Sequence, residues 1–162
     1  MAKNKEEKTN VMRVLEQKKI AYTAHTYPHE EGMAVDGVTV AKSMGFDPAI
    51  VFKTLVARGA SKQYYVFDVP VAENLDLKKA AKAVGEKSIE MIHQKELLPL
   101  TGYVHGGCSP VGMKKLFPTV FHETAENLET MIVSAGKIGY QVELAPRDLA
   151  ALVRAKFADI IV

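Results

Sequence analysis

Two neighbouring runs of β-branched and aromatic residues limit what this chain can fold into more than any other feature. They are "IVFKTLVA", residues 50–57, and "YYVFDVPV", residues 64–71. Residues of these types favour extended strands. The intervening "RGASKQ" contains glycine and serine and has the length of a hairpin link. The pattern predicts that the two runs pair as antiparallel strands.

Helix signals lie on both sides of this hairpin. Residues 10–18 begin with Asn10, a favourable N-cap, and carry apolar residues at helical spacing. The amphipathic stretch "LDLKKAAKAVG" starts a helix at Asp76 and stops it at Gly85. A short helix that ends near Pro99 is predicted in "HQKELLPLTG". Further short helices are expected in "DGVTVAKSMGF", "TAENLET" and "PRDLAALVRA".

Shorter runs predict the remaining strands, in "IAYTAHTY", "TVFH", "MIVSAG" and "YQVELAP". No internal repeat, low-complexity tract or linker divides the sequence. Helices and strands mixed in this way predict one α+β domain, with a mixed sheet and helices packed around it. We assign residues 1–9 to a charged N-terminal tail and residues 10–162 to the domain.

The composition is that of a globular protein in a reducing compartment. Of 162 residues, 48% are hydrophobic and 25% are charged, which argues against intrinsic disorder. The single cysteine excludes an internal disulfide and a multi-cysteine zinc site. The opening "MAKNKEEKTN" lacks the apolar core of a signal peptide, and no stretch reaches the roughly 18 apolar residues of a membrane span. We therefore expect a cytoplasmic protein with no membrane partner. The formal net charge of +2 is too small to indicate a nucleic-acid partner by itself.

The stretch "HGGCSPVG", residues 105–112, allows three interpretations. A metal site needs three or four ligands at short spacings, which His105 and Cys108 do not provide, so we expect no metal. Cys108 is a candidate nucleophile with His105 as its partner, although a lone cysteine is more often a small core residue. In the third interpretation, Gly106 and Gly107 let backbone amides face a substrate carbonyl or phosphate. A tight turn between a strand and a helix explains the same glycines.

Two further features of the sequence place polar groups in or next to predicted strands. Lys53 interrupts an apolar strand, where a lysine is costly unless its ammonium finds a partner or faces a cavity. It is either an anchor for a phosphate or carboxyl group, or a lysine on the solvated face of an edge strand. The stretch "VSAGKIGY" places Ser134, Gly136 and Lys137 after a β-rich run. Because it lacks the G-x-x-x-x-G-K-[ST] spacing, a hairpin turn is favoured over a phosphate loop.

Five segments of the sequence carry a resemblance to a known family. They are "VFKTLVA", "PVAENLDLKKAAKAVG", "TGYVHGGCSPVGMKK", "VSAGKIGYQVELAPRDL" and "AKFADI". Together they closely resemble the YbaK-type Cys-tRNA(Pro)/Cys-tRNA(Cys) deacylases of the prolyl-tRNA editing domain superfamily. The resemblance runs from about residue 10 to the C-terminus. Its specific part is the combination of the lysine strand with the GG-x-SP-x-G loop.

The resemblance implies both a fold and an activity. The implied fold is a mixed, largely antiparallel, barrel-like β-sheet flanked by helices. The implied activity is that of a free-standing hydrolase that clears cysteine mischarged onto proline tRNA, without a cofactor. Its substrate would be the acceptor end of aminoacyl-tRNA(Pro), and prolyl-tRNA synthetase is the candidate partner. Family members use neither a metal nor an enzyme nucleophile, because the substrate's own thiol attacks its ester carbonyl and releases a cyclic thiolactone.

The resemblance also implies site residues. The essential strand lysine of the family corresponds to Lys53, and the paired glycines correspond to Gly106 and Gly107. Substrate contacts are implied for Tyr27, Thr54, Ser109, Pro110, Ser134 and Gly136. Contacts to the tRNA acceptor stem are expected from lysines near the loop, namely Lys114, Lys115 and Lys137.

The residues themselves support this chemistry, because they offer backbone amides, hydroxyls and a lysine but no triad. A thiol that is already held beside the ester replaces an enzyme nucleophile. Loop amides would stabilise the developing oxyanion. Lys53 would either hold the terminal ribose or phosphate or assist the oxyanion. Cys108 stands where the family loop is variable, so we interpret its thiol as incidental.

Two positions depart from the family pattern. Asp36 and Gly37 stand where typical members carry Phe-Gly, and Gln141 replaces an aspartate of the later strand. Because the family associates both positions with the substrate pocket, the aminoacyl preference stays open. One alternative is a deacylase for Ala-tRNA(Pro) or another small aminoacyl-tRNA. The other is a non-catalytic module that binds tRNA or a synthetase.

Overall fold

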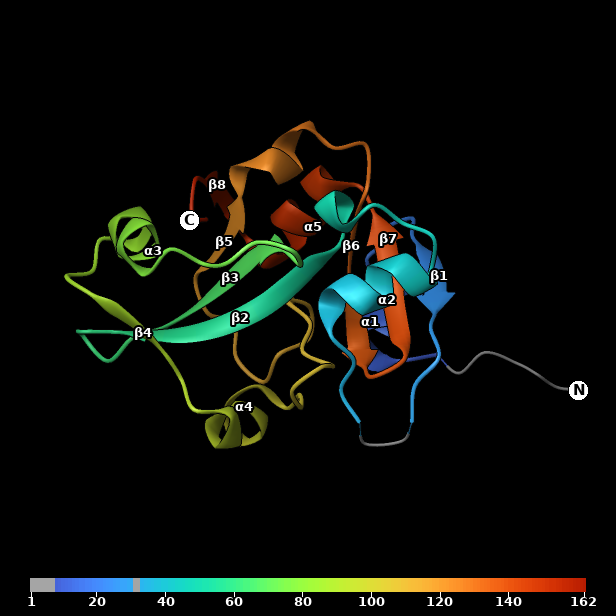
Figure 1. Ribbon diagram of the computed structural model, residues 1–162, viewed down its shortest axis with the longest axis horizontal. Coiled ribbons are helices and arrows are strands. Elements are labelled where there is room, and N and C mark those ends of the chain that lie inside the picture. Colours follow the sequence, from blue (N-terminus) through green and yellow to red (C-terminus); the bar gives the residue numbers. More distant parts are fainter. Residues whose placement is uncertain (1–7, 31–32) are drawn as a thin grey trace, which may run out of the picture.

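The strands form two sheets in the computed structural model, which describes residues 8–30 and 33–162 (Figure 1). The larger sheet has the strand order β4-β2-β3-β5-β8, and the smaller has the order β1-β7-β6. The larger sheet is built from β2 (Phe52–Gly59), β3 (Tyr64–Pro70), β4 (Ile89–Met91), β5 (Thr119–His122) and β8 (Lys156–Ala158). The smaller sheet is built from β1 (Thr23–Thr26), β6 (Met131–Lys137) and β7 (Tyr140–Leu144). The α+β class expected from the sequence is confirmed.

The pairing of the strands follows the predicted hairpin. β2 and β3 pair antiparallel, with Thr54 directly opposite Asp68. β4 adds antiparallel to β2, whereas β5 and β8 join in parallel. The strands of the smaller sheet pair antiparallel. A mixed, largely antiparallel arrangement is therefore confirmed, with the strands divided between two sheets that an isolated bridge from Val51 to Ile132 connects.

Short helices cover the sheets. The α-helices are α1 (Asn10–Gln17), α2 (Gly37–Ser43), α3 (Leu77–Val84), α4 (Gln94–Thr101) and α5 (Pro146–Val153), and the 3₁₀ turns are η1 (Pro48–Ile50) and η2 (Glu123–Asn127). Figure 1 shows α3 and α4 at the end of the larger sheet that carries β4. Asp76 caps α3 by accepting hydrogen bonds from two backbone amides, and Gly85 ends it with a φ of 76°, as the sequence predicts.

Several element ends differ from the predictions. Thr9, not Asn10, caps α1, because the Thr9 hydroxyl accepts a hydrogen bond from the Met12 amide at 3.2 Å. α4 continues through Pro99 to Thr101, since a proline in the last turn removes only one hydrogen bond of the ladder. The expected helix in "TAENLET" is the shorter η2, and β8 follows α5. The predicted charged tail lies mostly outside the described residues.

The larger sheet is buried on both faces. Phe52 and Phe121 lie on the face that packs toward β6 and α5. Phe67 and Val69 lie on the opposite face, which α3 covers through its alanines. Burial on both faces explains why β2 and β3 are nearly continuous apolar runs. None of the described helices is long and apolar enough to cross a membrane.

Candidate functional site

A cavity of about 490 Å³ opens where the start of β2 meets α2, the glycine loop and the smaller sheet. This volume lies in the range of small-molecule sites. Five predicted site residues line the cavity, namely Tyr27, Lys53, Thr54, Gly106 and Ser134. The positions that depart from the family pattern, Asp36, Gly37 and Gln141, line it as well. The fold thus brings together segments that are far apart in the sequence.

The edge of β2 explains why one strand contributes so much of the wall. Among the described strands, β4 pairs with β2 only along Ala57–Gly59, so residues 52–55 have no strand beside them on that edge. Successive side chains of a strand point to opposite faces. At this open edge, Lys53 from one face and Thr54 from the other both reach the cavity.

Lys53 presents a half-buried ammonium group to the cavity. Burial lowers the pKa of Lys53, while the charges of Asp36 and Glu73 act in the opposite direction. Within the described part of the chain, the ammonium makes no hydrogen bond or ion pair. A cation held in this way can bind an anionic or carbonyl oxygen without first breaking a bond to the protein.

The glycine loop reaches the cavity through Gly106 but not through Gly107. Gly106 has a φ of 91°, and a Cβ there would lie 2.7 Å from Cβ of Ala34 and 3.1 Å from its backbone Cα. A Cβ on Gly107 would lie 3.1 Å from the backbone nitrogen of Ile138. The Gly107 amide donates to the Val104 carbonyl at 3.0 Å, so it is already used within the turn. The expected cradle of two amides is therefore reduced to the region of Gly106.

The substitution Gly106→Ala is expected to destabilise the protein by about 3 kcal/mol, because it adds left-handed backbone strain and a clash with Ala34. Gly45→Ala is the matched control, since Gly45 has a φ of 79° with nothing within 4 Å of an added Cβ. It should cost only about 1 kcal/mol. Urea unfolding measures both values, and Ala34→Gly should recover part of the Gly106→Ala loss. Equal losses in the two single variants would show that the Ala34 contact is unimportant.

Cys108 borders the cavity as a buried thiol. Burial, with a smaller contribution from the charge of Asp68, raises the pKa of Cys108 to about 12. His105 is exposed and makes no hydrogen bond to the thiol among the described contacts. Because the thiolate is the nucleophilic form, these surroundings do not support the nucleophile interpretation.

Cys108→Ala is therefore expected to keep turnover within about three-fold of the unsubstituted protein, since a protonated buried thiol contributes packing only. Deacylation assays measure the turnover. Alkylation by iodoacetamide at neutral pH, followed by mass spectrometry, should proceed slowly until denaturant is added. Rapid alkylation of the folded protein together with loss of turnover would restore the nucleophile interpretation.

Three residues expected to bind substrate, Ser109, Pro110 and Gly136, do not line the cavity. Ser109 is fully buried, and its hydroxyl accepts a hydrogen bond from the Val111 amide at 3.2 Å. Pro110 is buried beside it. Gly136 has a φ of 92°, and a Cβ there would lie 2.9 Å from the ring of Tyr103. Sequence reasoning missed Tyr103, whose hydroxyl donates to the Val111 carbonyl and ties down the loop.

The two hydroxyl groups in the wall have opposite polarity. The Ser134 hydroxyl accepts a hydrogen bond from the Gly136 amide at 3.1 Å, so its own proton is available to the cavity. The Thr54 hydroxyl donates to Oδ1 of Asp68 at 2.5 Å, so it offers only lone pairs. The cavity therefore presents a donor at Ser134 and an acceptor at Thr54.

Asp68 was also missed by sequence reasoning. It is completely buried, and its Oδ2 has no hydrogen-bond partner among the described residues. Burial raises the pKa of Asp68 to about 7, although the hydrogen bond from Thr54 acts against this. The signal was present, because Asp68 is the only acidic residue in the run "YYVFDVPV".

The three lysines expected to contact tRNA lie outside the cavity wall. The Lys114 ammonium donates to the Pro99 carbonyl at 3.2 Å, and the Lys115 ammonium lies 5.9 Å from the centre of a phenylalanine ring. The Lys137 ammonium lies 5.4 Å from the ring centre of Tyr140. The Lys137 backbone packs against Gly107, which puts this lysine beside the glycine loop.

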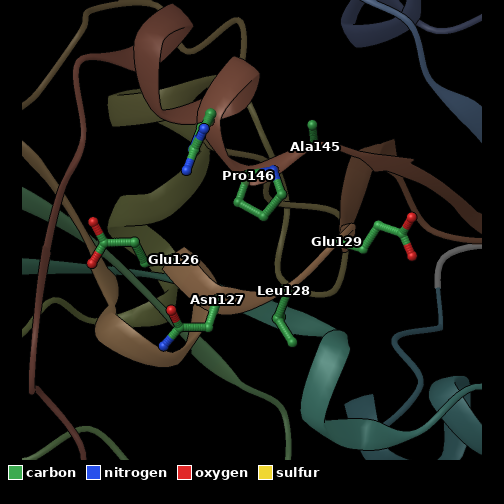
Figure 2. Close-up of a pocket in the computed structure, with 7 residues that line it drawn as sticks. Glu126, Asn127, Leu128, Glu129, Ala145 and Pro146 are labelled. Atoms are coloured by element: carbon green, nitrogen blue, oxygen red, sulfur yellow. The ribbon is translucent and has the colours of Figure 1, made fainter.

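A second depression lies between η2 and the start of α5 (Figure 2). Its wall includes Glu126, Glu129 and Pro146. Figure 2 shows the carboxylates of Glu126 and Glu129 pointing to opposite sides. Because a catalytic site needs groups that converge, we assign the candidate site to the cavity beside β2.

The sequence model of the aminoacyl-tRNA editing domain family matches residues 29–152. These residues include every residue of the cavity wall except Tyr27. The chain belongs to the aminoacyl-tRNA editing domain family. The resemblance identified from the sequence segments is thus confirmed. The matched residues also include the glycine loop and the β6–β7 turn, whose backbones pack against each other at Gly107.

Similar proteins extend this finding over nearly the whole chain. The chain is 46% identical over 161 residues to EbsC of Enterococcus faecalis, and the alignment covers 99% of this chain and 98% of that protein. The name of EbsC describes it as a Cys-tRNA(Pro)/Cys-tRNA(Cys) deacylase. A solved structure described as a trans-editing enzyme for prolyl-tRNA synthetase matches with a TM-score of 0.79 and 25% identity, over 94% of both chains. A scaffold protein that presents grafted linear epitopes matches with a TM-score of 0.82 and 25% identity, also over 94% of both chains.

Proposed function

We propose that this editing domain hydrolyses the ester of Cys-tRNA(Pro), and of Cys-tRNA(Cys), by a route that uses the thiol of the substrate. The groups that line the cavity are the main support for the proposal. They are a lysine ammonium without a hydrogen bond or ion pair among the described residues, a donor hydroxyl and a glycine loop, and the neighbouring Cys108 thiol is protonated. The name of the 46% identical relative supports the same substrate.

The chemistry divides between substrate and protein. The cysteine thiol attacks its own ester carbonyl, so a sulfur–carbon bond forms while the carbon–oxygen bond to the ribose breaks. Water then opens the cyclic thiolactone to free cysteine. Lys53 and the Gly106 amide stabilise the oxyanion, and the Ser134 hydroxyl donates to the ester or ribose. Holding thiol and ester together makes the attack intramolecular, which replaces an enzyme nucleophile.

The test compares the deacylation rates of Cys-tRNA(Pro), Ala-tRNA(Pro) and Ser-tRNA(Pro) in the presence of a chelator. Rapid loss of cysteine alone is expected, because only cysteine supplies the thiol. Preference for alanine or serine would indicate a different deacylase of the same family, and no hydrolysis of any ester would indicate a binding module.

One observation favours the second candidate, a deacylase for other small aminoacyl esters. Oε1 of Gln141 is buried in the wall without a hydrogen-bond partner among the described residues. It can accept a hydrogen bond from the α-ammonium group, which every aminoacyl ester carries. Such a contact gives affinity without selecting cysteine, and the comparison of the three esters measures this directly.

The tRNA contact is proposed for Lys114, Lys115 and Lys137. If the three lysines contact one phosphate each, the slope of log K against log salt concentration is expected to be about −2 to −3. Fluorescence anisotropy with labelled tRNA(Pro) measures the slope, and replacing the three lysines with alanine should flatten it. Alanine at Lys78 and Lys82 on α3 is the control and should leave it unchanged. Binding that does not respond to salt would contradict this surface.

The same charge balance supports prolyl-tRNA synthetase as a partner. With a formal net charge of only +2, the domain alone is expected to bind tRNA weakly. A synthetase that holds the tRNA would raise the local concentration of the acceptor end. The proposal expects faster deacylation at low tRNA concentration when prolyl-tRNA synthetase is added.

A further inference from the structure

A buried carboxyl group lies directly behind the cavity wall, and the proposed reaction has so far given it no role. Asp68 on β3 is 0% exposed and does not line the cavity, whereas its cross-strand neighbour Thr54 does. The Thr54 hydroxyl donates to Oδ1 of Asp68 at 2.5 Å. The other carboxyl oxygen has no partner among the described residues. A buried polar atom left without a partner is costly, which favours a functional reason for keeping it.

This hydrogen bond fixes what Thr54 can offer to a ligand. A hydroxyl has one proton and two lone pairs. Because the proton is directed to Asp68, the part of the hydroxyl that faces the cavity can only accept a hydrogen bond. It therefore suits a donor on the substrate, such as a thiol S–H, better than a carbonyl or phosphate oxygen.

We propose that Asp68 is the proton acceptor for the substrate thiol and that the Thr54 hydroxyl relays the proton. The inference rests on the proposed thiol-assisted reaction. As the sulfur–carbon bond forms, the S–H bond breaks, the proton passes to Oγ1 of Thr54, and the original hydroxyl proton moves to Oδ1 of Asp68. When the carbon–oxygen bond to the ribose breaks, the reverse transfer supplies the proton of the new ribose hydroxyl. Asp68 does not touch the substrate, so it acts as a positioning residue.

The surroundings of Asp68 favour this role. Cys108 from the glycine loop is its titratable neighbour, and the raised pKa of this thiol keeps it uncharged. The strands beside β3 carry Lys53, Arg58 and His122. Strand alternation puts Lys53 and His122 on the face opposite Asp68. Arg58 shares the face of Asp68, but it lies four residues along β2 from Thr54 and pairs with Glu90 and Glu96. The pKa of Asp68, raised to about 7, lies near the working pH and near the ordinary thiol pKa of about 8.5. A base matched in this way is efficient at neutral pH.

The test is the pH dependence of kcat/KM for Cys-tRNA(Pro) with the full-length protein. The unsubstituted protein is expected to show an ascending limb with an apparent pKa near 7. Asp68→Asn should lower kcat/KM by about 100-fold at neutral pH and abolish this limb. Activity should then rise again above pH 8.5, where the thiol ionises without help. A residue with a purely structural role would not shift the limb in this way.

Variants of Thr54 provide the matched pair. Thr54→Val removes the relay in nearly the same volume and should reproduce the Asp68→Asn profile, whereas Thr54→Ser should keep the limb near pH 7. Thermal unfolding at each pH confirms that every variant is folded. An unchanged limb in Asp68→Asn, with the unsubstituted protein active, would overturn the relay alone. An unsubstituted protein that does not hydrolyse Cys-tRNA, or hydrolyses Ala-tRNA(Pro) equally fast, would overturn the proposed function and the relay with it.

Discussion

Lys53→Ala is expected to lower kcat/KM for Cys-tRNA(Pro) by about 100-fold to 1,000-fold, measured in single-turnover deacylation assays. The ammonium is half-buried and makes no ion pair among the described residues, so its charge is available to the developing oxyanion or the terminal ribose. Removing one preorganised donor from such a site costs about 3–4 kcal/mol of transition-state stabilisation. The loss should therefore appear mainly in kcat.

The folded protein should tolerate this change. Burial lowers the pKa of Lys53, which means that the folded state disfavours its charge, and alanine removes that cost. Thermal unfolding should show no loss of stability. Lys78→Ala, at an exposed position on α3, is the control for a lost surface charge and should keep full activity. A rate for Lys53→Ala within about three-fold of the unsubstituted protein would exclude Lys53 from the chemistry.

Asp68→Asn is expected to change how folding stability depends on pH. Because burial raises the pKa of Asp68 to about 7 from its ordinary value of 3.8, the folded protein holds this proton more tightly than the unfolded chain does. The stabilisation is complete below about pH 4 and is lost as the pH rises through about 7. A shift of this size corresponds to about 4 kcal/mol. The asparagine variant cannot ionise, so it should gain about that much relative to the unsubstituted protein between pH 4 and pH 8.

Urea unfolding of both proteins across this pH range measures the difference. Carboxylates with lowered pKa values, such as Glu16 and Glu143, affect the two proteins equally and cancel. Thr54→Val removes the hydrogen bond that lowers the pKa of Asp68, so it should steepen the loss of stability at high pH. A stability difference that stays constant from pH 4 to pH 8 would show that Asp68 is ionised with an ordinary pKa in the folded protein.

Local patterns predicted most elements of the fold because each depends on neighbours in the sequence. The β2–β3 hairpin follows from two β-forming runs and a short link, and α3 follows from Asp76 and Gly85. The exceptions have local competitors. Thr9 stands one position before Asn10 and is also a favourable cap residue, and Pro99 falls where a helix can lose one hydrogen bond.

The sequence predicted the candidate site less accurately than the fold, because a motif identifies residues but not the directions in which their side chains point. Lys53, Gly106 and Ser134 line the cavity. Ser109 belongs to the same motif, yet it is fully buried and bonded to the Val111 amide, since the loop itself needs that hydroxyl.

The sequence by itself determined the α+β class, the central hairpin, the family resemblance and the lysine that stands out in an apolar strand. These depend on residue types and short spacings. Only the tertiary structure decided that β4 leaves the edge of β2 open, that the Gly107 amide is used within its own turn, and that Asp68 is buried behind Thr54. Such features depend on contacts between segments far apart in the chain. Burial and hydrogen-bond direction then determine the charge of each side chain and whether it donates or accepts a hydrogen bond. A local sequence pattern does not predict either property.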